Sequence, residues 1–215
     1  MRIVHIGLAA HFTPDMNYQD EIISEINVLD GHDVVYISDS YKYVDGILTH
    51  VNEEDIPLPN GVRLIRLEYD TVFNNVLSEK LRKVKKINVL LEQISPDVIL
   101  FHGIGGYSLL YVREYVKSHP HTILFADCHA SFDNSSRNIV SLLYNKYVNG
   151  YFIRKTKPYI KKIFYVADEC KLYLSKLYHI DESSMEWFPL GGLIFSSKDK
   201  EAARQVVINQ LGIED

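Results

Sequence analysis

The chain has 215 residues, of which 47% are hydrophobic and 24% charged, with a formal net charge of −5. This length and composition are typical of a soluble globular protein with one α/β domain, or with one domain and the start of another. They argue against a general nucleic-acid binder, which needs a surplus of Lys and Arg, and no apolar run approaches the roughly 20 residues of a membrane span.

The first sixty residues predict two buried strands, one helix and a long loop. Residues 2–7 and 33–38 are continuous apolar runs, typical of strands buried on both faces. Between them, Ile22, Ile26 and Leu29 recur at helical spacing, and Gly31 ends this helix. Residues 39–60 are polar, irregular and broken by two prolines, which predicts an excursion over the surface.

The rest of the chain continues the alternation of strand and helix. Five more strands are predicted, over residues 61–67, 97–103, 122–129, 162–167 and 185–191. The clearest helix runs from Leu77 to Leu91, and an amphipathic helix over residues 198–211 comes last. Because parallel strands need right-handed crossovers, we predict an α/β fold. It is a doubly wound, mostly parallel Rossmann-like sheet of about six to seven strands flanked by helices.

Ligands bind such sheets outside the carboxyl ends of the strands, so the residues that follow each strand are the candidates for a site. After the first strand these candidates are Gly7, His11, Asn17 and Tyr18. The loop that holds them opens onto a helix, whose free amides favour anions. The alternative is a plain loop in which Asp15 or Asn17 caps the helix.

Two further strand ends carry candidate residues. His102 and Gly103 follow the fourth strand, in a glycine-rich stretch that either lets a ligand approach the backbone or simply makes a tight turn. Asp127 and His129 close the fifth strand. A histidine there can bind a hydroxyl or a phosphate; the alternative is a histidine that caps the next helix or is satisfied by Asp127.

Several motifs that would indicate a cofactor do not occur in the sequence. There is no GxGxxG, no GxxxxGK[ST], no HExxH and no DxD pair, so we expect neither a dinucleotide cofactor nor a metal site. Cys128 and Cys170 are not spaced as a metal-ligand pair, and we expect them to be reduced thiols in a cytoplasmic protein.

Two basic clusters stand out in a chain of negative net charge. The first comprises Lys80, Arg82, Lys83, Lys85 and Lys86, and the second Arg154, Lys155, Lys157, Lys161 and Lys162. Such charges usually only solvate a helix face. Together with tyrosines 144, 147, 151 and 159, they could instead contact an anionic membrane surface.

Five segments, in chain order, together resemble a known family. They are RIVHIG with the loop after it, PNGVRLIRL, SPDVILFHG, LFADCHASF, and YVADECKLYLSKLYHIDESSMEWFPLGGL. This set resembles the amino-terminal half of the family 4 glycosyltransferases, which are retaining enzymes of GT-B architecture. The last segment is the most specific, since it combines a strand, a helix, a strand and a Pro-Leu-Gly exit. The first loop departs from the family, which usually has a Gly-Gly pair before a glutamate where this chain has Pro14-Asp-Met-Asn-Tyr-Gln-Asp-Glu21.

The resemblance implies a division of the chain and an activity. Residues 1–192 would form the Rossmann-like acceptor-side domain, and residues 193–215 the linker and first helix of a donor-binding domain that the chain lacks. The whole enzyme would transfer a sugar, with retention and without a metal, from a nucleotide-sugar to a glycan or lipid-linked acceptor. This is a step in polysaccharide biosynthesis at the inner face of the membrane. His129 would act near the reacting sugar, and the other candidates would bind substrate. Alone, the chain would have little or no activity.

Two other functions stay open at this stage. The chain could be a stand-alone Rossmann-like binding or interaction module, in which case Ala203, Val206, Val207 and Leu211 should pack on its own sheet. A nicotinamide-dependent oxidoreductase is disfavoured because the glycine fingerprint is missing.

Overall fold

The computed structural model describes residues 1–190 and 196–212. Its strands are β1 (Arg2–Gly7), β2 (Asp33–Asp39), β3 (Tyr41–Val44), β4 (Ile47–His50), β5 (Glu54–Pro57), β6 (Arg63–Leu67), β7 (Val98–Phe101), β8 (Ile123–Cys128), β9 (Ile160–Tyr165) and β10 (Met185–Trp187). Its α-helices are α1 (Gln19–Leu29), α2 (Asn75–Leu81), α3 (Lys86–Ile94), α4 (Ser108–Ser118), α5 (Phe132–Ser135), α6 (Ile139–Leu143), α7 (Gly150–Thr156), α8 (Asp168–Tyr178) and α9 (Ser197–Leu211). All seven strands predicted from the sequence are present.

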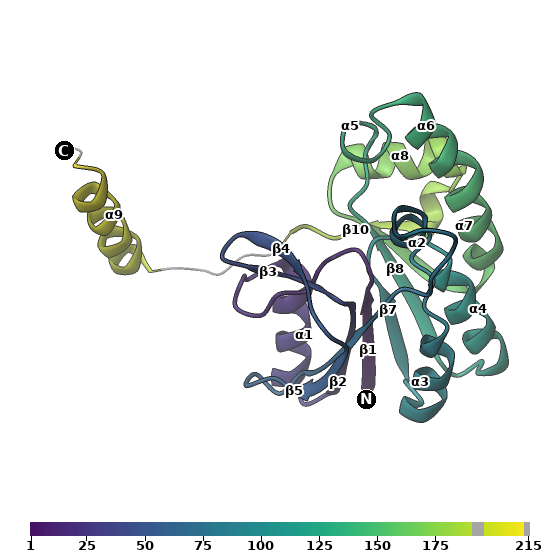
Figure 1. The fold of residues 1–215 in the computed structure, drawn as a ribbon, viewed down its shortest axis with the longest axis horizontal. Coiled ribbons are helices and arrows are strands. Elements are labelled where there is room, and N and C mark those ends of the chain that lie inside the picture. The colour runs from purple at the N-terminus through teal and green to yellow at the C-terminus, as the bar shows by residue number, and fades with distance from the viewer. Residues whose placement is uncertain (191–195, 213–215) are drawn as a thin grey trace.

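Eight strands form one twisted sheet in the order β10-β9-β8-β7-β1-β2-β6-β5 (Figure 1). Every neighbouring pair is parallel except β5 with β6, so the seven predicted strands make the parallel part. From β1 the chain adds β2 and β6 on one side, then returns to add β7 on the other. This reversal between β1 and β7 is the switch point of a doubly wound sheet, and the predicted fold class is confirmed.

The polar segment between β2 and β6 contains structure that its sequence did not predict. Here β3 and β4 pair as an antiparallel hairpin, and β5 lines the sheet edge. The organiser is Arg66, whose side chain is only 1% exposed. Its guanidinium donates to Glu54 at 2.6 Å and to the backbone carbonyl of Phe12 at 2.7 Å. Because a buried charge is costly unless paired, Arg66 holds this polar segment against the sheet, and the prediction of an irregular loop was wrong.

The helix predicted from Leu77 to Leu91 is two helices. The chain turns at Arg82, which has a left-handed φ of 48°. Ser108 secures the break, because its hydroxyl donates to the Arg82 carbonyl at 2.7 Å and accepts the amide of Val84 at 2.9 Å. A non-glycine residue at positive φ leaves no clear sequence signal, so the interruption could not be seen from periodicity.

The α1 helix has its predicted position but buries a different face. Ile26 and Leu29 are 49% and 78% exposed, whereas Glu21 and Ser24 are buried. The Glu21 carboxylate accepts the backbone amides of Asp15 and Asn17, at 2.6 and 2.7 Å, and so fastens the loop that precedes the helix. The N-cap residue is Tyr18, and neither predicted cap fills that position.

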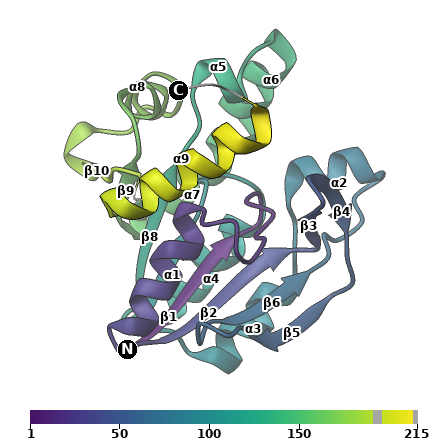
Figure 2. The same ribbon diagram turned by 90° about the vertical axis from the view of Figure 1, so that its left-hand side faces the viewer.

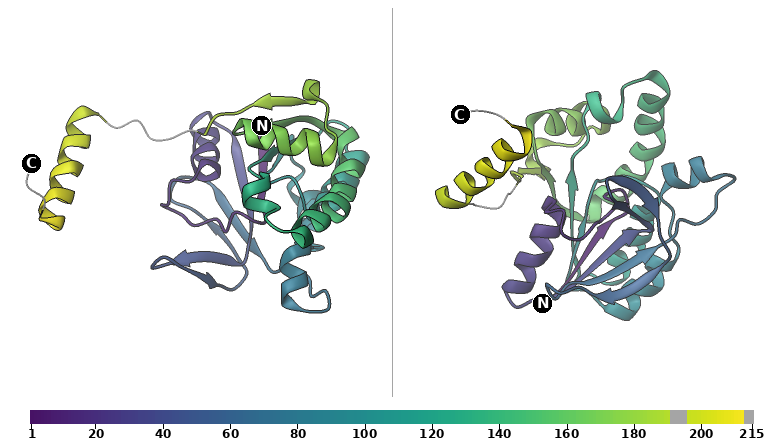
Figure 3. Two further views of the ribbon diagram at one scale, coloured as in Figure 1. Left: turned by 90° about the horizontal axis from the view of Figure 1, so that it is seen from above. Right: turned by 60° about the vertical axis from the view of Figure 1, so that its left-hand side comes forward.

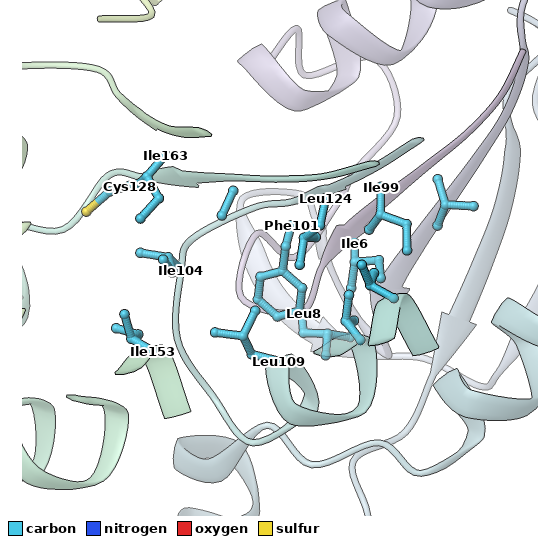
Figure 4. Packing of buried hydrophobic residues seen from close by; sticks show 14 of the residues in the cluster. Ile6, Leu8, Ile99, Phe101, Ile104, Leu109, Leu124, Cys128, Ile153 and Ile163 are labelled. Atoms are coloured by element: carbon cyan, nitrogen blue, oxygen red, sulfur yellow. The ribbon is translucent and has the colours of Figure 1, made fainter. Parts of the chain in front are cut away.

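The two faces of the sheet are covered unequally. A large apolar cluster, part of which Figure 4 shows, packs β1, β7, β8 and β9 against α3, α4, α7 and α8. The opposite face carries α1 (Figure 2). A small apolar cluster around Phe12 and Tyr36 also lies there. Farther along that face, the rings of Phe125, Phe164 and Phe188 follow one another in a row, tilted against each other with centres 5.6 and 5.3 Å apart, and stay partly exposed.

The α9 helix stands apart from the sheet (Figures 1 and 3). Ala203 is exposed, as are Val206 at 54%, Val207 at 49% and Leu211 at 66%, so they do not pack on the sheet. The glycine of the predicted Pro-Leu-Gly exit and residues 193–195 of the predicted linker lie outside the described residues. No helix in the described part of the chain is both long and apolar enough to cross a bilayer.

Candidate functional site

A cleft of about 490 Å³ opens at the carboxyl ends of β1, β7 and β8, at the switch point of the sheet. The loops after these strands supply one part of its wall, through Ala9, His102 and His129. The other part comes from the start of α1 and from the helical segment between β8 and β9. Gly103, Gly105 and Gly106 all have positive φ, which lets the loop after β7 turn tightly at the cleft.

Asp127 is the electrostatic centre of this cleft although it does not line it. Its side chain is 1% exposed and accepts hydrogen bonds from His102 Nδ1 and from the Gly103 amide, both at 2.6 Å. His129 Nε2 lies 3.5 Å from Oδ1 of Asp127, the oxygen that also accepts the Gly103 amide. Burial alone would raise the pKa of Asp127, but the attraction of His102 and the hydrogen bonds from both histidines outweigh it. They hold the pKa well below its usual range.

Behind Asp127, a chain of hydrogen bonds runs into the core. His102 Nε2 lies 3.0 Å from His5 Nδ1, and His5 Nε2 lies 3.0 Å from the Asn27 side-chain nitrogen. One set of neutral tautomers satisfies every nitrogen: Asn27 donates to His5, His5 to His102, and His102 to the carboxylate of Asp127. Burial, and then the nearby His102, lower the pKa of His5 well below its usual value, in keeping with a neutral ring.

His129 is the member of this group that reaches the solvent, with 44% of its side chain exposed. Burial lowers its pKa, but the hydrogen bond and charge of Asp127 more than compensate, so the pKa is raised. A histidine in this state carries more positive charge near neutral pH and can donate to a sugar hydroxyl or a phosphate oxygen. Its surroundings therefore suit it to bind an oxygen that gains negative charge.

The wall opposite His129 belongs to the start of α1. Tyr18 lines the cleft, and so does Asp20, which accepts the Tyr36 hydroxyl at 2.5 Å. Gln19 lines it too, and both polar atoms of its amide are buried without a hydrogen-bond partner among the described residues. Because unpaired buried amides are costly, the Gln19 side chain is available for a ligand's hydroxyl group.

A second, wider hollow of about 770 Å³ adjoins the first. His11 lines it beside the aromatic rings of Tyr41, Tyr69 and Tyr144. Arg82 lines both hollows, and the guanidinium of this residue forms no ion pair with any carboxylate in the described part of the chain. A free cation at this junction is suited to an anionic group bound across the two hollows.

The predicted site residues fall into three groups. Around the first cleft, the structure brings together Tyr18, His102, Gly103 and His129, with Asp127 buried directly behind them. His11 lies in the second hollow.

Besides the buried Asp127, two predicted residues line neither hollow. A Cβ atom on Gly7 would lie 1.9 Å from the Tyr36 hydroxyl oxygen, so this glycine makes room for the tyrosine. The backbone amide of Asn17 serves Glu21 instead of a ligand.

Many residues of the site were not among the candidates, and four of them offer polar groups to the hollows or to the chain of hydrogen bonds behind Asp127. They are His5, Gln19, Arg82 and Asn149. His5 lies inside an apolar strand, where a histidine resembles a core residue. Arg82 was noted only as one of a basic cluster.

Other groups near the cleft do not form a metal site. In the described ranges, no set of three or more His, Cys, Asp and Glu side chains is arranged to hold a metal ion. Cys128 and Cys170 are both free and buried. A hydrogen bond from Cys128 lowers the pKa of the Cys170 thiol to about 7, and the pKa of Cys128 is raised in turn.

No family model matches the chain, and no curated protein matches it in sequence. Solved structures do match it in fold. The catalytic domain of starch synthase IV from Arabidopsis thaliana, bound to ADP and acarbose, aligns with a TM-score of 0.60 and 14% identity over 100% of this chain and 60% of its own. A glycosyltransferase from Rickettsia africae aligns with a TM-score of 0.51 and 13% identity over 100% of this chain and 50% of its own.

The N-terminal domain of trehalose-6-phosphate phosphatase from Candida albicans gives a TM-score of 0.54 and 10% identity over 97% of this chain and 54% of its own. The chain thus spans between one half and three fifths of these three structures. At such low identity the likeness concerns the fold. The chain therefore shares its fold with about half of each of these structures, one of which is a glycosyltransferase by name.

Proposed function

We propose that this chain is the acceptor-side half of a GT-B glycosyltransferase, which moves a sugar from a nucleotide-sugar to a glycan or lipid-linked acceptor. The observation that carries the proposal is the placement of His129. It faces a cleft at the switch point, beside a buried carboxylate and a second histidine. The fold likeness to a starch synthase and a glycosyltransferase supports it.

In this proposal, residues 1–192 bind the acceptor, and residues 193–215 lead into a donor-binding half. Two surfaces are in line with such a second half: the apolar residues of α9, and the partly exposed row of Phe125, Phe164 and Phe188. The enzyme would act in the cytoplasm, in line with the two free thiols.

His129 donates a hydrogen bond to an oxygen of the donor sugar or to the attacking hydroxyl, with Asp127 holding its ring. Charge on the departing diphosphate is stabilised by basic groups of the donor-binding half, to which Arg82 adds a cation from this half. The chemistry needs neither a metal ion nor a protein nucleophile, and the sugar keeps its anomeric configuration.

The second hollow is suited to the acceptor. Tyr41, Tyr69 and Tyr144 offer flat apolar faces with hydroxyl groups at their edges, a combination that suits sugar rings. The first cleft adjoins this hollow at Arg82 and Asn149, so an acceptor bound there reaches toward His129. Holding the hydroxyl near the donor carbon is this half's contribution to the rate.

The test is a transfer assay with the product of the native gene and a panel of nucleotide-sugars. Release of nucleoside diphosphate that depends on an acceptor is expected. His129→Ala should lower kcat by about 10²- to 10³-fold, the usual range for losing one hydrogen-bond donor to an oxygen that gains charge in the reaction. His121→Ala is the matched control, since His121 is exposed and precedes the same strand that His129 follows.

Three outcomes bear on the proposal directly. Residues 1–215 alone should give no transfer, and NMR of the product should show the anomeric configuration of the donor. An active enzyme that is indifferent to His129→Ala would remove the assigned role of His129. A native gene product that releases no nucleoside diphosphate from any donor would overturn the glycosyltransferase assignment.

A further inference from the structure

The segment 134–167 has a charge unlike that of the rest of the chain. It holds seven of the chain's 23 Lys and Arg residues and none of its 28 Asp and Glu residues, although the chain as a whole carries a net charge of −5. This segment forms α6, the π-helical turn Tyr144–Asn149, α7 and all of β9. The basic charge is therefore concentrated on one part of the fold.

The same segment exposes a row of apolar side chains. Ile139, Leu143, Tyr147 and Tyr151 follow one another at four-residue spacing, with exposed fractions of 72%, 47%, 60% and 49%. Val140 beside them is 73% exposed. Residues four apart share one helix face, so these side chains form a continuous outer stripe, which we call the α6–α7 stripe.

The basic side chains nearest the stripe are free to meet an external anion. Lys146 lies with its ammonium 5.7 Å from the Tyr147 ring centre, and Lys155 lies 5.8 Å from that of Tyr151. In the part of the chain that the structure describes, neither these lysines nor Arg154 pair with a carboxylate, whereas Lys157 and Lys162 pair with Asp181 and Glu186. An apolar stripe flanked by free cations is the pattern of an interfacial helix.

A second exposed apolar tip lies beside the wider hollow. Phe73, just before α2, is 93% exposed and has a left-handed φ of 63°, and Val76 is 67% exposed. Val76 and Ser141 line the same hollow, so α2 and α6 stand on its two sides, and Figure 2 shows both helices projecting beyond the sheet. The two tips therefore flank the entrance to the proposed acceptor site.

We propose that the α6–α7 stripe, together with Phe73 and Val76, docks on an anionic phospholipid bilayer with the hollow opening toward it. Exposed Ile, Val and Leu side chains enter the headgroup boundary, while Lys146, Arg154 and Lys155 meet anionic headgroups. A second copy of the chain fits this surface poorly, because a twofold contact would set the basic residues against each other. Nucleic acid fits poorly because the stripe is apolar. The inference goes beyond the proposed function and does not need transfer to be observed.

The test is co-sedimentation of the 215-residue chain with vesicles of phosphatidylcholine, alone or mixed with phosphatidylglycerol. Binding is expected only to the mixed vesicles and should weaken as salt rises. Lys146→Glu with Lys155→Glu should lower the vesicle partition coefficient by at least about tenfold. Lys117→Glu with Lys176→Glu, on α4 and α8, makes the same change in net charge and should leave binding unchanged.

A second variant separates the apolar contribution from charge. Ile139→Ser with Val140→Ser keeps every charge and should still weaken binding to mixed vesicles, while the melting temperature stays the same because both side chains are exposed. Equal binding to neutral vesicles, equal loss in the control variant, or no vesicle binding would overturn the proposal. So would light-scattering evidence of a dimer that Lys146→Glu with Lys155→Glu dissolves. These readouts do not depend on sugar transfer, so this proposal and the proposed function fail separately.

Discussion

Two buried carboxylates at the carboxyl edge of the sheet each form a short hydrogen bond with the Nδ1 atom of a histidine, and the two histidines differ in their other partners. Asp127 on β8 and Asp39 on β2 flank the central pair β7 and β1, and both are almost fully buried. Asp127 accepts from His102, whereas Asp39 accepts from His11 Nδ1 at 2.7 Å and from the Tyr69 hydroxyl at 2.8 Å. A buried carboxylate hydrogen-bonded to a histidine thus occurs twice, once beside each hollow.

The difference lies in how far each histidine is connected. His102 is 7% exposed and continues through His5 to Asn27, so its ring is fixed on both sides. His11 keeps 30% of its side chain exposed and meets the second hollow. The ring of His102 is therefore fixed because the core supplies it with a second hydrogen-bond partner. The ring of His11 has no such partner among the described residues of the core and can adjust its position.

The largest expected effect is that of Asp127→Asn. Each Asp127 oxygen accepts from an N–H group, so the new amide must face one of these donors with its own NH₂. If that NH₂ faces His102, then His102 must accept a hydrogen bond instead of donating one. The donor and acceptor roles of His102, His5 and Asn27 would then all have to be reversed. We expect a loss of about 3 kcal/mol in the free energy of unfolding, as for other broken buried pairs. Urea denaturation near pH 7 measures it.

Asp39→Asn is the matched comparison for Asp127→Asn. Its two short hydrogen bonds reach one oxygen, and the other oxygen accepts only a 3.3 Å contact from the Tyr41 amide. The amide can therefore orient with little conflict, and the loss should be about 1 to 2 kcal/mol. Equal losses for the two variants would contradict the difference argued between the two sites.

The next effect is a pH dependence of the free energy of unfolding, and it arises from His5 in the hydrogen-bond chain behind Asp127. The pKa of His5 is lowered in the folded protein, so below about pH 6.5 the unfolded chain binds a proton that the folded chain refuses. Stability should then fall by about 1.4 kcal/mol per pH unit on acidification, until the folded-state pKa of His5 is reached. The raised pKa of His129 acts in the opposite sense but more weakly, because this side chain is partly exposed.

His5→Gln removes this titration while keeping a polar side chain. Urea denaturation at several values between about pH 7 and pH 5 should give a flatter stability profile for the variant than for the native chain. His121→Ala, at an exposed position, should keep the native slope. An unchanged slope in His5→Gln would mean that His5 is not held neutral by its burial.

Sequence patterns predicted the parallel part of the fold because apolar strands and helical spacing are local signals. They failed where a distant partner decides the structure. The polar segment around β5 is ordered by Arg66, the α2–α3 break by Ser108, and the buried face of α1 by the loop that Glu21 fastens. Each of these contacts joins residues whose pairing no periodicity reveals.

The candidate site shows the same division. The rule that ligands meet the carboxyl ends of strands selected His102, Gly103 and His129, which the structure places together at the first cleft. It could not select His5, because a histidine in the middle of an apolar strand gives the same pattern as a core residue. It also included Asn17, whose backbone instead serves Glu21.

A smaller effect is expected at Tyr69, on the Asp39 side. Tyr69→Phe removes a hydroxyl that the Leu8 carbonyl, at 2.5 Å, and Asp39, at 2.8 Å, share, and keeps the ring in place. Since His11 still donates to that carboxylate, the loss should be about 1 kcal/mol, which urea denaturation can resolve. The ring NMR signals of His102 should not move. A shift in them would show that the two carboxylates share one network.

The smallest effect is expected for His11→Asn, and it tests the independence of the two sites most directly. His11 has a left-handed φ of 51°, which Asn tolerates better than most residues, and water can replace its ring. The loss should be about 0.5 kcal/mol or less. Three strand spacings, about 14 Å, separate β8 from β2, a distance at which effects usually add.

The double variant His11→Asn with Asp127→Asn should therefore lose the sum of the two single losses, to within about 0.5 kcal/mol. A larger deviation would mean that the loop after β1 transmits strain between the two carboxylates. In that event a ligand bound in the wider hollow would change the stability of the His129 side of the site without contacting it. The two hollows would then form one coupled site.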